Sequence, residues 1–141
     1  MRSKIGEKAG PLRETVTADR IRAFRKAVGA SDGSPDSAPP TFMTVLRAGE
    51  FELFRRLGIP LSSLLHAEQT YSYVATIQAG DELEFETELV QALSKRGTRG
   101  EMHFLTLDTT VAALRPSGRV SVGTCRSVIL ARETASREGE K

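Results

Sequence analysis

Two histidines are the only imidazoles of this 141-residue chain, and they are the first candidates for acid–base chemistry. An imidazole changes charge near neutral pH, so it can accept or donate a proton during catalysis. His66 opens a predicted strand two residues before Glu68, whose carboxylate could orient the ring if a β-bulge or the strand start brings the two together. His103 alternates with Leu105 and Leu107, which is typical of a partly buried core residue. We therefore take His66 as the candidate catalytic histidine.

Two aspartates lie in a polar loop directly before the most apolar helical segment of the chain. Residues 30–38 contain Asp32 and Asp36 and no apolar side chain larger than alanine, which predicts a turn-rich loop. The free backbone N–H groups of a helix start point outward, so chemistry is expected at this end of the helix. Asp32 is the second candidate catalytic residue. The alternative is that both carboxylates are solvated in an exposed turn.

The helix that must position these groups is predicted over residues 38–58. Its apolar residues recur at steps of three and four and widen into a stripe over most of the circumference. The residues left for a solvent-exposed edge are Arg47, Glu50, Glu52, Arg55 and Arg56. A helix this apolar needs a sheet wrapped around it.

The ends of this helix carry recognisable signals. Pro39 and Pro40 mark its start, with the Thr41 hydroxyl available as a cap, and Gly58 marks its end. Gly49 leaves two alternatives open: it allows a strand to pass close, or it breaks the segment into two shorter helices. An earlier surface helix is predicted after Thr17 as N-cap, with one buried stripe, which consists of Ile21, Phe24 and Val28.

Strands are predicted before and after the helices. Residues 12–16 are an extended piece for the edge of a sheet, and residues from His66 onward alternate with a period of two. Four glutamates on one side of the strand over 82–89 indicate a solvated sheet face and not a metal site. The basic hairpin residues Lys95, Arg96 and Arg99 are expected on the surface. The fold class is therefore α+β, a curled antiparallel sheet wrapped around one central helix.

Length and composition indicate one domain over residues 1–131, followed by a charged tail over 132–141 that we expect to be disordered. Twenty Lys and Arg against 18 Asp and Glu leave a net charge of +2, mixed too evenly to indicate nucleic-acid binding. No run approaches the roughly 20 apolar residues of a membrane span. The single cysteine, Cys125, cannot form an internal disulfide, so a reducing, cytoplasmic location is expected. Its apolar strand makes it a poor nucleophile.

Three short motifs, in this order and spacing, resemble the MaoC-like dehydratase family. They are Ala38-Pro39-Pro40-Thr41-Phe42, Leu65-His66-Ala67-Glu68-Gln69 and Ala79-Gly80-Asp81. The chain is most similar to the N-terminal half of that family, the FAS1-like dehydratase domain, over roughly residues 4–131. The resemblance implies the hot-dog fold and an acyl thioester, on coenzyme A or acyl carrier protein, as the ligand. It implies no metal and no further cofactor, and it assigns substrate contacts to Pro40, Thr41, Phe42 and Glu68.

The chain departs from the family at the catalytic motif. Catalytic members of the family it resembles carry an Asp-x-Asn-Pro-x-His motif in the loop before the central helix. At that place this chain reads Ala30-Ser31-Asp32-Gly33-Ser34-Pro35-Asp36. The loop keeps an aspartate but lacks the Asn-Pro and the His. Pro39 and Pro40 also remove two N–H donors where an oxyanion would be stabilised.

Three hypotheses follow. The first is a hot-dog subunit that lacks the standard acid–base pair and dimerises with itself or with a catalytic paralogue. The second is a self-sufficient acyl-CoA hydratase using His66 with Asp32, or a thioesterase in which Glu50 or an aspartate activates water. The third is a non-enzymatic acyl-CoA-binding module. Whether the chain is an enzyme by itself is left open by the sequence.

Overall fold

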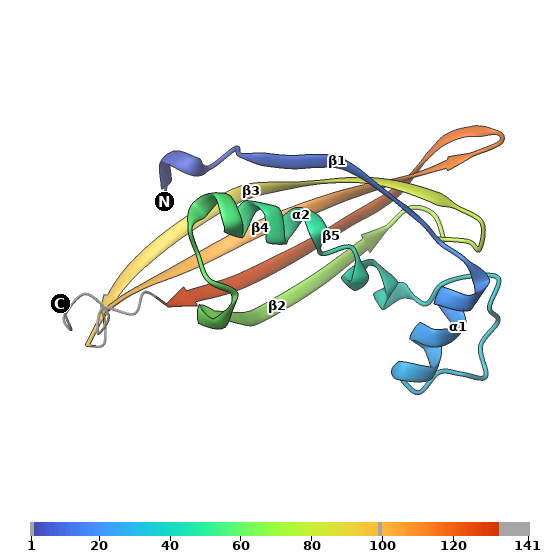
Figure 1. Ribbon diagram of the computed structural model, residues 1–141, viewed down its shortest axis with the longest axis horizontal. Coiled ribbons are helices and arrows are strands. Elements are labelled where there is room, and N and C mark those ends of the chain that lie inside the picture. Colours follow the sequence, from blue (N-terminus) through green and yellow to red (C-terminus); the bar gives the residue numbers. More distant parts are fainter. Residues whose placement is uncertain (1, 99, 133–141) are drawn as a thin grey trace.

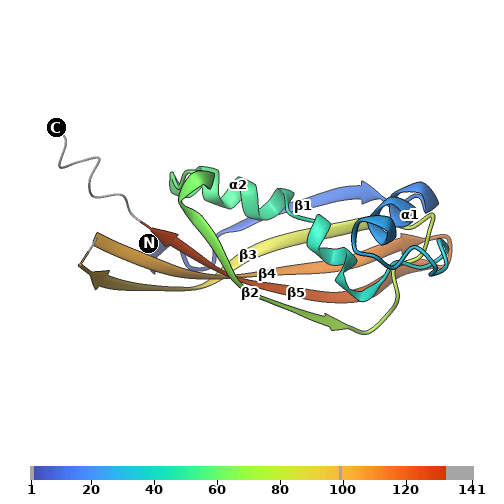
Figure 2. The ribbon, with the colours of Figure 1, turned by 90° about the horizontal axis from the view of Figure 1, so that it is seen from below.

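The computed structural model describes residues 2–98 and 100–132, which form one long antiparallel sheet with the helices on one face (Figures 1 and 2). Within these residues the five strands follow the order β1-β3-β4-β5-β2, so β1 and β2 are the two edges. The strand bounds are β1 Lys8–Thr15, β2 Leu64–Tyr73, β3 Glu82–Gly97, β4 Gly100–Arg115 and β5 Gly118–Arg132. The helices are α1 Ala18–Ala27 and α2 Ala48–Leu57, with short 3₁₀ turns η1 Arg2–Lys4, η2 Pro40–Val45 and η3 Leu61–Ser63. The predicted α+β architecture is confirmed.

The alternating residues of strand β3 give the sheet one buried face and one solvent-exposed face. Leu83, Phe85, Thr87 and Leu89 are buried toward the helices. The alternating glutamates lie on the other face, where Glu82 and Glu84 bind the guanidinium of Arg13 and Glu84 also contacts Arg119. Strand β1 begins at Lys8, earlier than the predicted extended segment, and pairs with β3 as the predicted edge strand.

The predicted single helix over 38–58 is wrong, and its alternative of two shorter helices is confirmed. The chain forms η2, leaves helical geometry at Leu46 (φ −89°, ψ 64°) and restarts as α2, so the break lies just before Gly49. The break lets the two pieces fill separate parts of the core. Phe42 and Met43 of η2 pack into one apolar cluster, whereas Leu53 and Phe54 of α2 pack into another. Helical periodicity alone does not distinguish one long stripe from two short ones.

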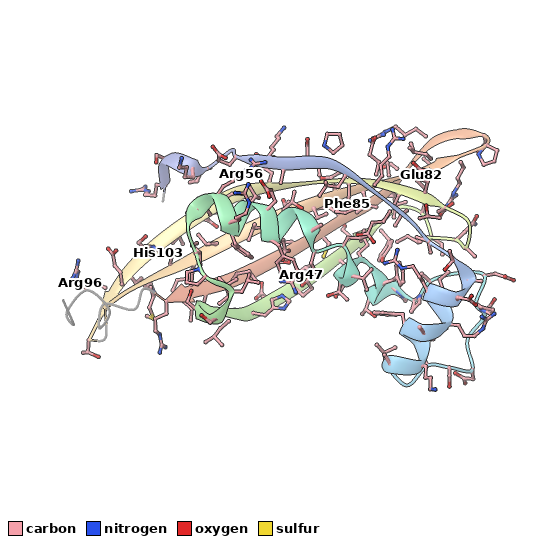
Figure 3. The ribbon with its side chains drawn as sticks, viewed as in Figure 1. Arg47, Arg56, Glu82, Phe85, Arg96 and His103 are labelled. Atoms are coloured by element: carbon pink, nitrogen blue, oxygen red, sulfur yellow. The ribbon has the colours of Figure 1, made fainter. Side chains whose placement is uncertain are left out.

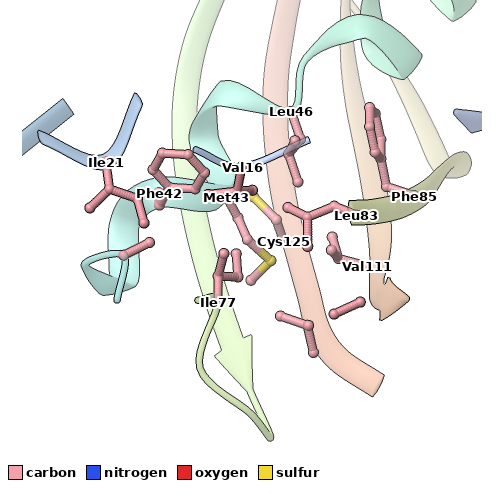
Figure 4. Packing of buried hydrophobic residues seen from close by; sticks show 13 residues of the cluster. Val16, Ile21, Phe42, Met43, Leu46, Ile77, Leu83, Phe85, Val111 and Cys125 are labelled. Carbon is pink, nitrogen blue, oxygen red and sulfur yellow. The ribbon is translucent and has the colours of Figure 1, made fainter. Parts of the chain in front are cut away.

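The first cluster joins η2 to the sheet and to the N-terminal segments (Figure 4). Phe42 and Met43 are packed among Val16, Ile21 and Cys125. The Phe42 ring also meets Phe24 of α1 edge to face, with centroids 5.3 Å apart. This contact fixes α1 against η2 at one end of the molecule.

The predicted helix caps are confirmed in part. The Thr17 hydroxyl accepts a hydrogen bond from the Arg20 N–H at 3.1 Å, as expected of an N-cap. Thr41, in contrast, makes no capping bond, because η2 starts from Pro39 and is a 3₁₀ turn. The prediction that Val28 belongs to the buried stripe of α1 is wrong: Val28 is 51% exposed, because it lies past the last helical residue.

Strand β5 reaches the end of the described part of the chain. Arg132 belongs to β5, so the tail predicted from 132 starts one residue too early, and residues 133–141 lie outside the described part. Lys95 and Arg96 are exposed as predicted, while Arg99 lies outside the described residues.

No helix in the described ranges is both long enough and apolar enough to cross a membrane.

Gly49 is where α2 and the sheet touch most closely. A Cβ atom at this position would lie 2.3 Å from Oγ1 and 2.8 Å from Cβ of Thr87 on β3. The Thr87 hydroxyl is itself held by Thr109 at 2.8 Å within the core. The predicted close approach of a strand at Gly49 is therefore confirmed.

Replacing Gly49 with alanine should destabilise the fold, because either the helix or the Thr87–Thr109 pair must move to admit one methyl group. Overpacking of this kind costs about 1–3 kcal/mol. Urea unfolding of Gly49→Ala, beside the control Ala48→Ser at the exposed neighbouring position, measures the loss. Equal urea midpoints for the two variants would contradict this prediction, because they would show that a methyl group fits between Gly49 and Thr87.

Candidate functional site

A buried carboxylate lies between the start of α2 and strand β5. Glu50 is only 2% exposed, and its Oε1 accepts a hydrogen bond from Arg47 Nε at 2.8 Å. Its Oε2 accepts a hydrogen bond from the Ser127 hydroxyl of β5 at 2.6 Å. Figure 3 shows Arg47 at the end of α2 that lies near η2. The assignment of Glu50 to the solvent-exposed edge is therefore wrong.

The position of Glu50 has a physical explanation. Gly49 brings this first turn of α2 against the sheet, so the next residue is also enclosed, whereas Phe51 points outward and is 44% exposed. A carboxylate near a helix N-terminus is favoured by the helix dipole. Burying the charge is tolerable only because both oxygens are hydrogen-bonded and one partner is a guanidinium.

Cys125 of β5 lies near enough to Glu50 to be affected by its charge, and Gln69 in turn contacts Cys125. The Gln69 side chain on β2 donates to the carbonyl of Arg126 at 3.4 Å and contacts the Cys125 sulfur, while its own Oε1 is buried without a partner among the described residues. Burial of Cys125, with the nearby negative charge of Glu50 as a further cause, raises the pKa of its thiol to about 11. The thiol is thus protonated at neutral pH, in keeping with its predicted poor nucleophilicity.

A β-bulge in β2 separates His66 from Glu68. His66 lies opposite Ile129 and Glu68 opposite Val128, with Ala67 as the extra residue between them. Neighbouring residues of β5 point to opposite faces, so the His66 side chain lies on the helix side and that of Glu68 on the other side. His66 Nε2 instead approaches the backbone carbonyl of Glu68 at 3.0 Å. The hypothesis that a bulge brings the carboxylate to the imidazole is therefore wrong.

Asp32 and His66 are not brought together. The loop that carries Asp32 and Asp36 is tied to the segment after β2, because the N–H of Ala79 bonds to the carbonyl of Asp36 at 2.8 Å. His66 lies at the start of β2, and a strand rises about 3.3 Å per residue, so roughly 20 Å separates the two places. Both aspartates are exposed, as the alternative of a solvated turn predicted. The catalytic roles of Asp32 and His66 stay predictions, and the two residues do not share a site.

A cavity of about 330 Å³ opens beside the loop and η2. Its walls are Ala38, Pro40 and the segment Tyr73–Ile77. Burial raises the pKa of Tyr73 to about 12, although the backbone of Met43 acts in the opposite direction. The structure thus places Pro40 at a cavity wall, leaves Thr41 exposed and buries Phe42 in the core. The predicted substrate contacts of these residues and of Glu68 stay predictions.

His103 is part of the β3–β4 hairpin. Figure 3 shows it together with Arg96 toward the free end of that hairpin, away from Arg47. Its Nδ1 is 2.7 Å from the hydroxyl of Ser94, the residue directly opposite on β3. His103 is partly buried, as its alternation with leucines predicted.

Sequence reasoning missed the group made by Arg47, Glu50, Gln69 and Ser127. One signal was present: Glu50 falls four residues after Leu46 and three before Leu53, which is the spacing of the apolar stripe. A charged residue on the buried stripe of a helix is rarely left unpaired. Ser127 carried no such signal, because a serine in a strand is usual on either face.

The sequence matches a family model described as "FAS1-like, dehydratase domain region" over residues 3–115. A UPF0336 protein of Streptomyces griseus is 33% identical over 121 residues, which cover 80% of this chain and 79% of that protein. The structure resembles a chain of the HadBC (3R-hydroxyacyl-ACP dehydratase) complex from Mycobacterium tuberculosis, with a TM-score of 0.70 and 17% identity over 91% of this chain and 97% of that one. A MaoC-like dehydratase gives a TM-score of 0.72 and 20% identity over 95% of this chain, which spans 44% of the larger protein. The hot-dog fold expected from the sequence is confirmed.

Removing the Ser127 hydroxyl should destabilise the chain, because Glu50 then keeps a buried, charged oxygen without a donor. A hydrogen bond to a charged group contributes about 1.5–3 kcal/mol. Urea unfolding of Ser127→Ala should show a loss of this size. The control Ser72→Ala changes an exposed serine on neighbouring β2 and should leave stability almost unchanged. Equal stability of both variants would mean that Glu50 does not need Ser127.

The Cys125 thiol should resist thiol reagents in the folded chain and react once per chain after unfolding in guanidinium. Its pKa is raised from 9.0 to about 11, so the folded state holds the thiol proton more tightly than the unfolded state. The resulting stabilisation is complete below pH 9 and is lost as the pH rises toward 11. Titration with a chromogenic disulfide measures the reactivity, and fast labelling of the folded chain at neutral pH would contradict the burial.

Proposed function

Because the chain belongs to the FAS1-like dehydratase domain family, a hot-dog family of MaoC-like dehydratases and hydratases, we propose that it is a subunit that binds an acyl thioester without supplying the acid and base. In this role it contributes ligand-binding walls and carrier contacts within a dimer, formed with itself or with a catalytic paralogue. Hydration of an enoyl thioester, or dehydration of a 3-hydroxyacyl thioester, then uses proton-transfer groups of the other subunit.

The observation that carries this proposal is the separation of the candidate acid–base groups. General acid–base catalysis requires groups within hydrogen-bond range of the substrate at the same time. Asp32 is exposed in a loop at one end of β2, and His66 is at the other end. The nearby carboxylate of Glu50 has both oxygens engaged by Arg47 and Ser127. A self-sufficient hydratase or thioesterase therefore finds little support.

The cavity beside η2 supports a ligand-binding role. Its volume of about 330 Å³ lies at the lower end of the range for small-molecule sites, and its lining combines apolar side chains with about as much polar surface. The apolar part of this lining suits a short acyl group, which coenzyme A or acyl carrier protein would carry. Lys95 and Arg96 are exposed on the β3–β4 hairpin, but they lie about ten residues along β3 from Phe85, which is level with Tyr73 of the cavity wall, so roughly 30 Å separates them from this cavity.

Turnover of crotonyl-CoA separates the alternatives. The purified chain should hydrate it slowly or not at all, and addition of a hot-dog paralogue with an intact Asp-x-Asn-Pro-x-His motif should raise the rate. Because general acid–base catalysis contributes a factor of about 10² to 10⁴, the rise should be of that order. Calorimetric titration with butyryl-CoA measures ligand binding independently of turnover.

The variants Asp32→Asn, His66→Ala and Glu50→Gln identify any base that the chain supplies by itself. Weak activity that is indifferent to all three supports the proposal. Robust activity of the lone chain that His66→Ala abolishes would establish a self-sufficient hydratase, and thioester hydrolysis lost in Glu50→Gln would establish a thioesterase. Ligand binding with no rate increase beside the paralogue would indicate a non-enzymatic binding module.

A further inference from the structure

A row of apolar side chains crosses the outer face of the sheet, which is the face away from α2. Strands β2, β5, β4 and β3 each contribute one residue, in directly opposed positions: Leu65, Leu130, Phe104 and Leu93. The residues that alternate with them in β3, β4 and β5 are buried in the core, so these four side chains point outward. Leu65 is 59% exposed and Leu93 is 49% exposed. We call these four side chains the apolar row.

The apolar row differs from the rest of the outer face. Further along β3 the outward side chains are the glutamates at 82, 84, 86 and 88, which bind arginines of β1 and β5. Single exposed apolar residues on a surface need no explanation, whereas contiguous ones mark a contact with a protein or a membrane. The apolar row is contiguous over four strands, so it is a candidate docking surface.

Two cations border the apolar row on the side of the β3–β4 turn. Lys95, Met102 and Arg132 lie opposite one another in the registers of β3, β4 and β5 and form the next outward-facing row. Lys95 Nζ is 5.8 Å from the centroid of the Phe104 ring, so the lysine stem covers apolar surface while its charge stays accessible. Lys95 and Arg132 are both exposed.

The N-terminal segment brings further cations to the same end of the sheet. Because β1 runs antiparallel to β3, the residues before Lys8 extend along β3 past Leu89 toward the β3–β4 turn. Figures 1 and 2 show the N-terminus at this end of the sheet, which we call the hairpin end. Arg2 and Lys4 of η1 are exposed there, and the apolar side chain of Ile5 is 45% exposed.

These cations keep their charge unpaired within the described chain. The two cations of η1 and the two beside the apolar row make no ion pair within residues 2–98 and 100–132. Of the acids at this end, Glu7 is bound by Arg56 at 3.5 Å, and Glu101 lies opposite Arg96 on the helix side of the hairpin. Positive charge is therefore in excess at the hairpin end, next to the apolar row.

This combination matches an anionic bilayer better than a protein surface. Apolar side chains bordered by lysine and arginine bind at the boundary of headgroups and acyl chains, where anionic lipids attract the cations. A protein lying flat on the outer face would also have to meet the glutamates of β3. A bilayer touched only by the hairpin end leaves these glutamates in water, away from its negative charge.

We propose that the hairpin end docks on the surface of an anionic lipid bilayer. The apolar row enters the headgroup region, and Arg2, Lys4, Lys95 and Arg132 bind lipid phosphates. The contact lies in the plane of the interface and needs no spanning segment. The cavity beside η2 lies toward the other end of the sheet, so docking leaves it accessible and does not depend on the proposed function.

Vesicle co-sedimentation tests the role of the cations. The chain should bind vesicles of equimolar phosphatidylcholine and phosphatidylglycerol at low salt, and it should not bind vesicles of phosphatidylcholine alone. Lys95→Gln combined with Arg132→Gln should weaken binding roughly 30-fold, because each cation near an anionic surface contributes about a factor of five. The control Arg22→Gln with Lys26→Gln removes two exposed cations of α1 and should leave binding unchanged.

A second pair of variants tests the apolar row. Leu93 and Val28 are 49% and 51% exposed, so Leu93→Ser and the control Val28→Ser remove similar side chains from opposite ends of the chain. Leu93→Ser should weaken vesicle binding about three- to tenfold, the contribution of burying the exposed part of a leucine. Val28→Ser should bind like the wild type. Equal urea midpoints for the wild type and both variants ensure that folded chains are compared.

The outcomes are independent of turnover, because vesicle binding requires no acyl thioester. Binding that needs phosphatidylglycerol, falls as salt is added and is weakened by the hairpin-end variants but not by their controls supports the proposal. No binding to either vesicle, equal binding to both, or hairpin-end variants that behave like their controls would overturn it. Self-association that Leu93→Ser abolishes, without vesicle binding, would also overturn it, because the apolar row would then contact protein.

Discussion

The close contact between α2 and β3 at Gly49 is the constraint on which the rest of the structure depends. With no Cβ at this position, the first turn of α2 lies directly on Thr87. Because the helix lies this close to the sheet, Glu50 is buried as well. Its carboxylate oxygens accept hydrogen bonds from Arg47 and Ser127. One small residue thus determines where the helix lies and which charged group is buried.

The buried carboxylate bears on function through its hydrogen bonds. A general base must have an accessible oxygen and a proton to remove, whereas both oxygens of Glu50 are bonded within the fold. Together with Gln69 and Cys125, the Glu50 carboxylate forms a polar cluster where α2, β2 and β5 meet. The separation of Asp32 from His66 in a hot-dog fold supports the proposal of a subunit that does not supply the acid and base.

The two edge strands of the sheet, β1 and β2, differ in their neighbours. The long β3, β4 and β5 strands are paired on both sides, and Arg56 and Pro11 make β1 a poor template for another strand. On β2 the Gln69 side chain contacts Cys125, while Leu65, and Val74 directly after the strand, are exposed.

The sequence by itself determined the local secondary structure and its boundaries at caps and turns. Period-two alternation in β3, the Thr17 cap and the turn at Gly58 depend on neighbouring residues, so they could be predicted from the sequence. The tertiary structure decided what depends on distant contacts: the division of residues 38–58 between two cores, and the burial of Glu50 against Ser127, 77 residues later. It also decided the bulge at Ala67, which turned Glu68 away from His66. The register between β2 and β5 decides this bulge, and no local pattern encodes it.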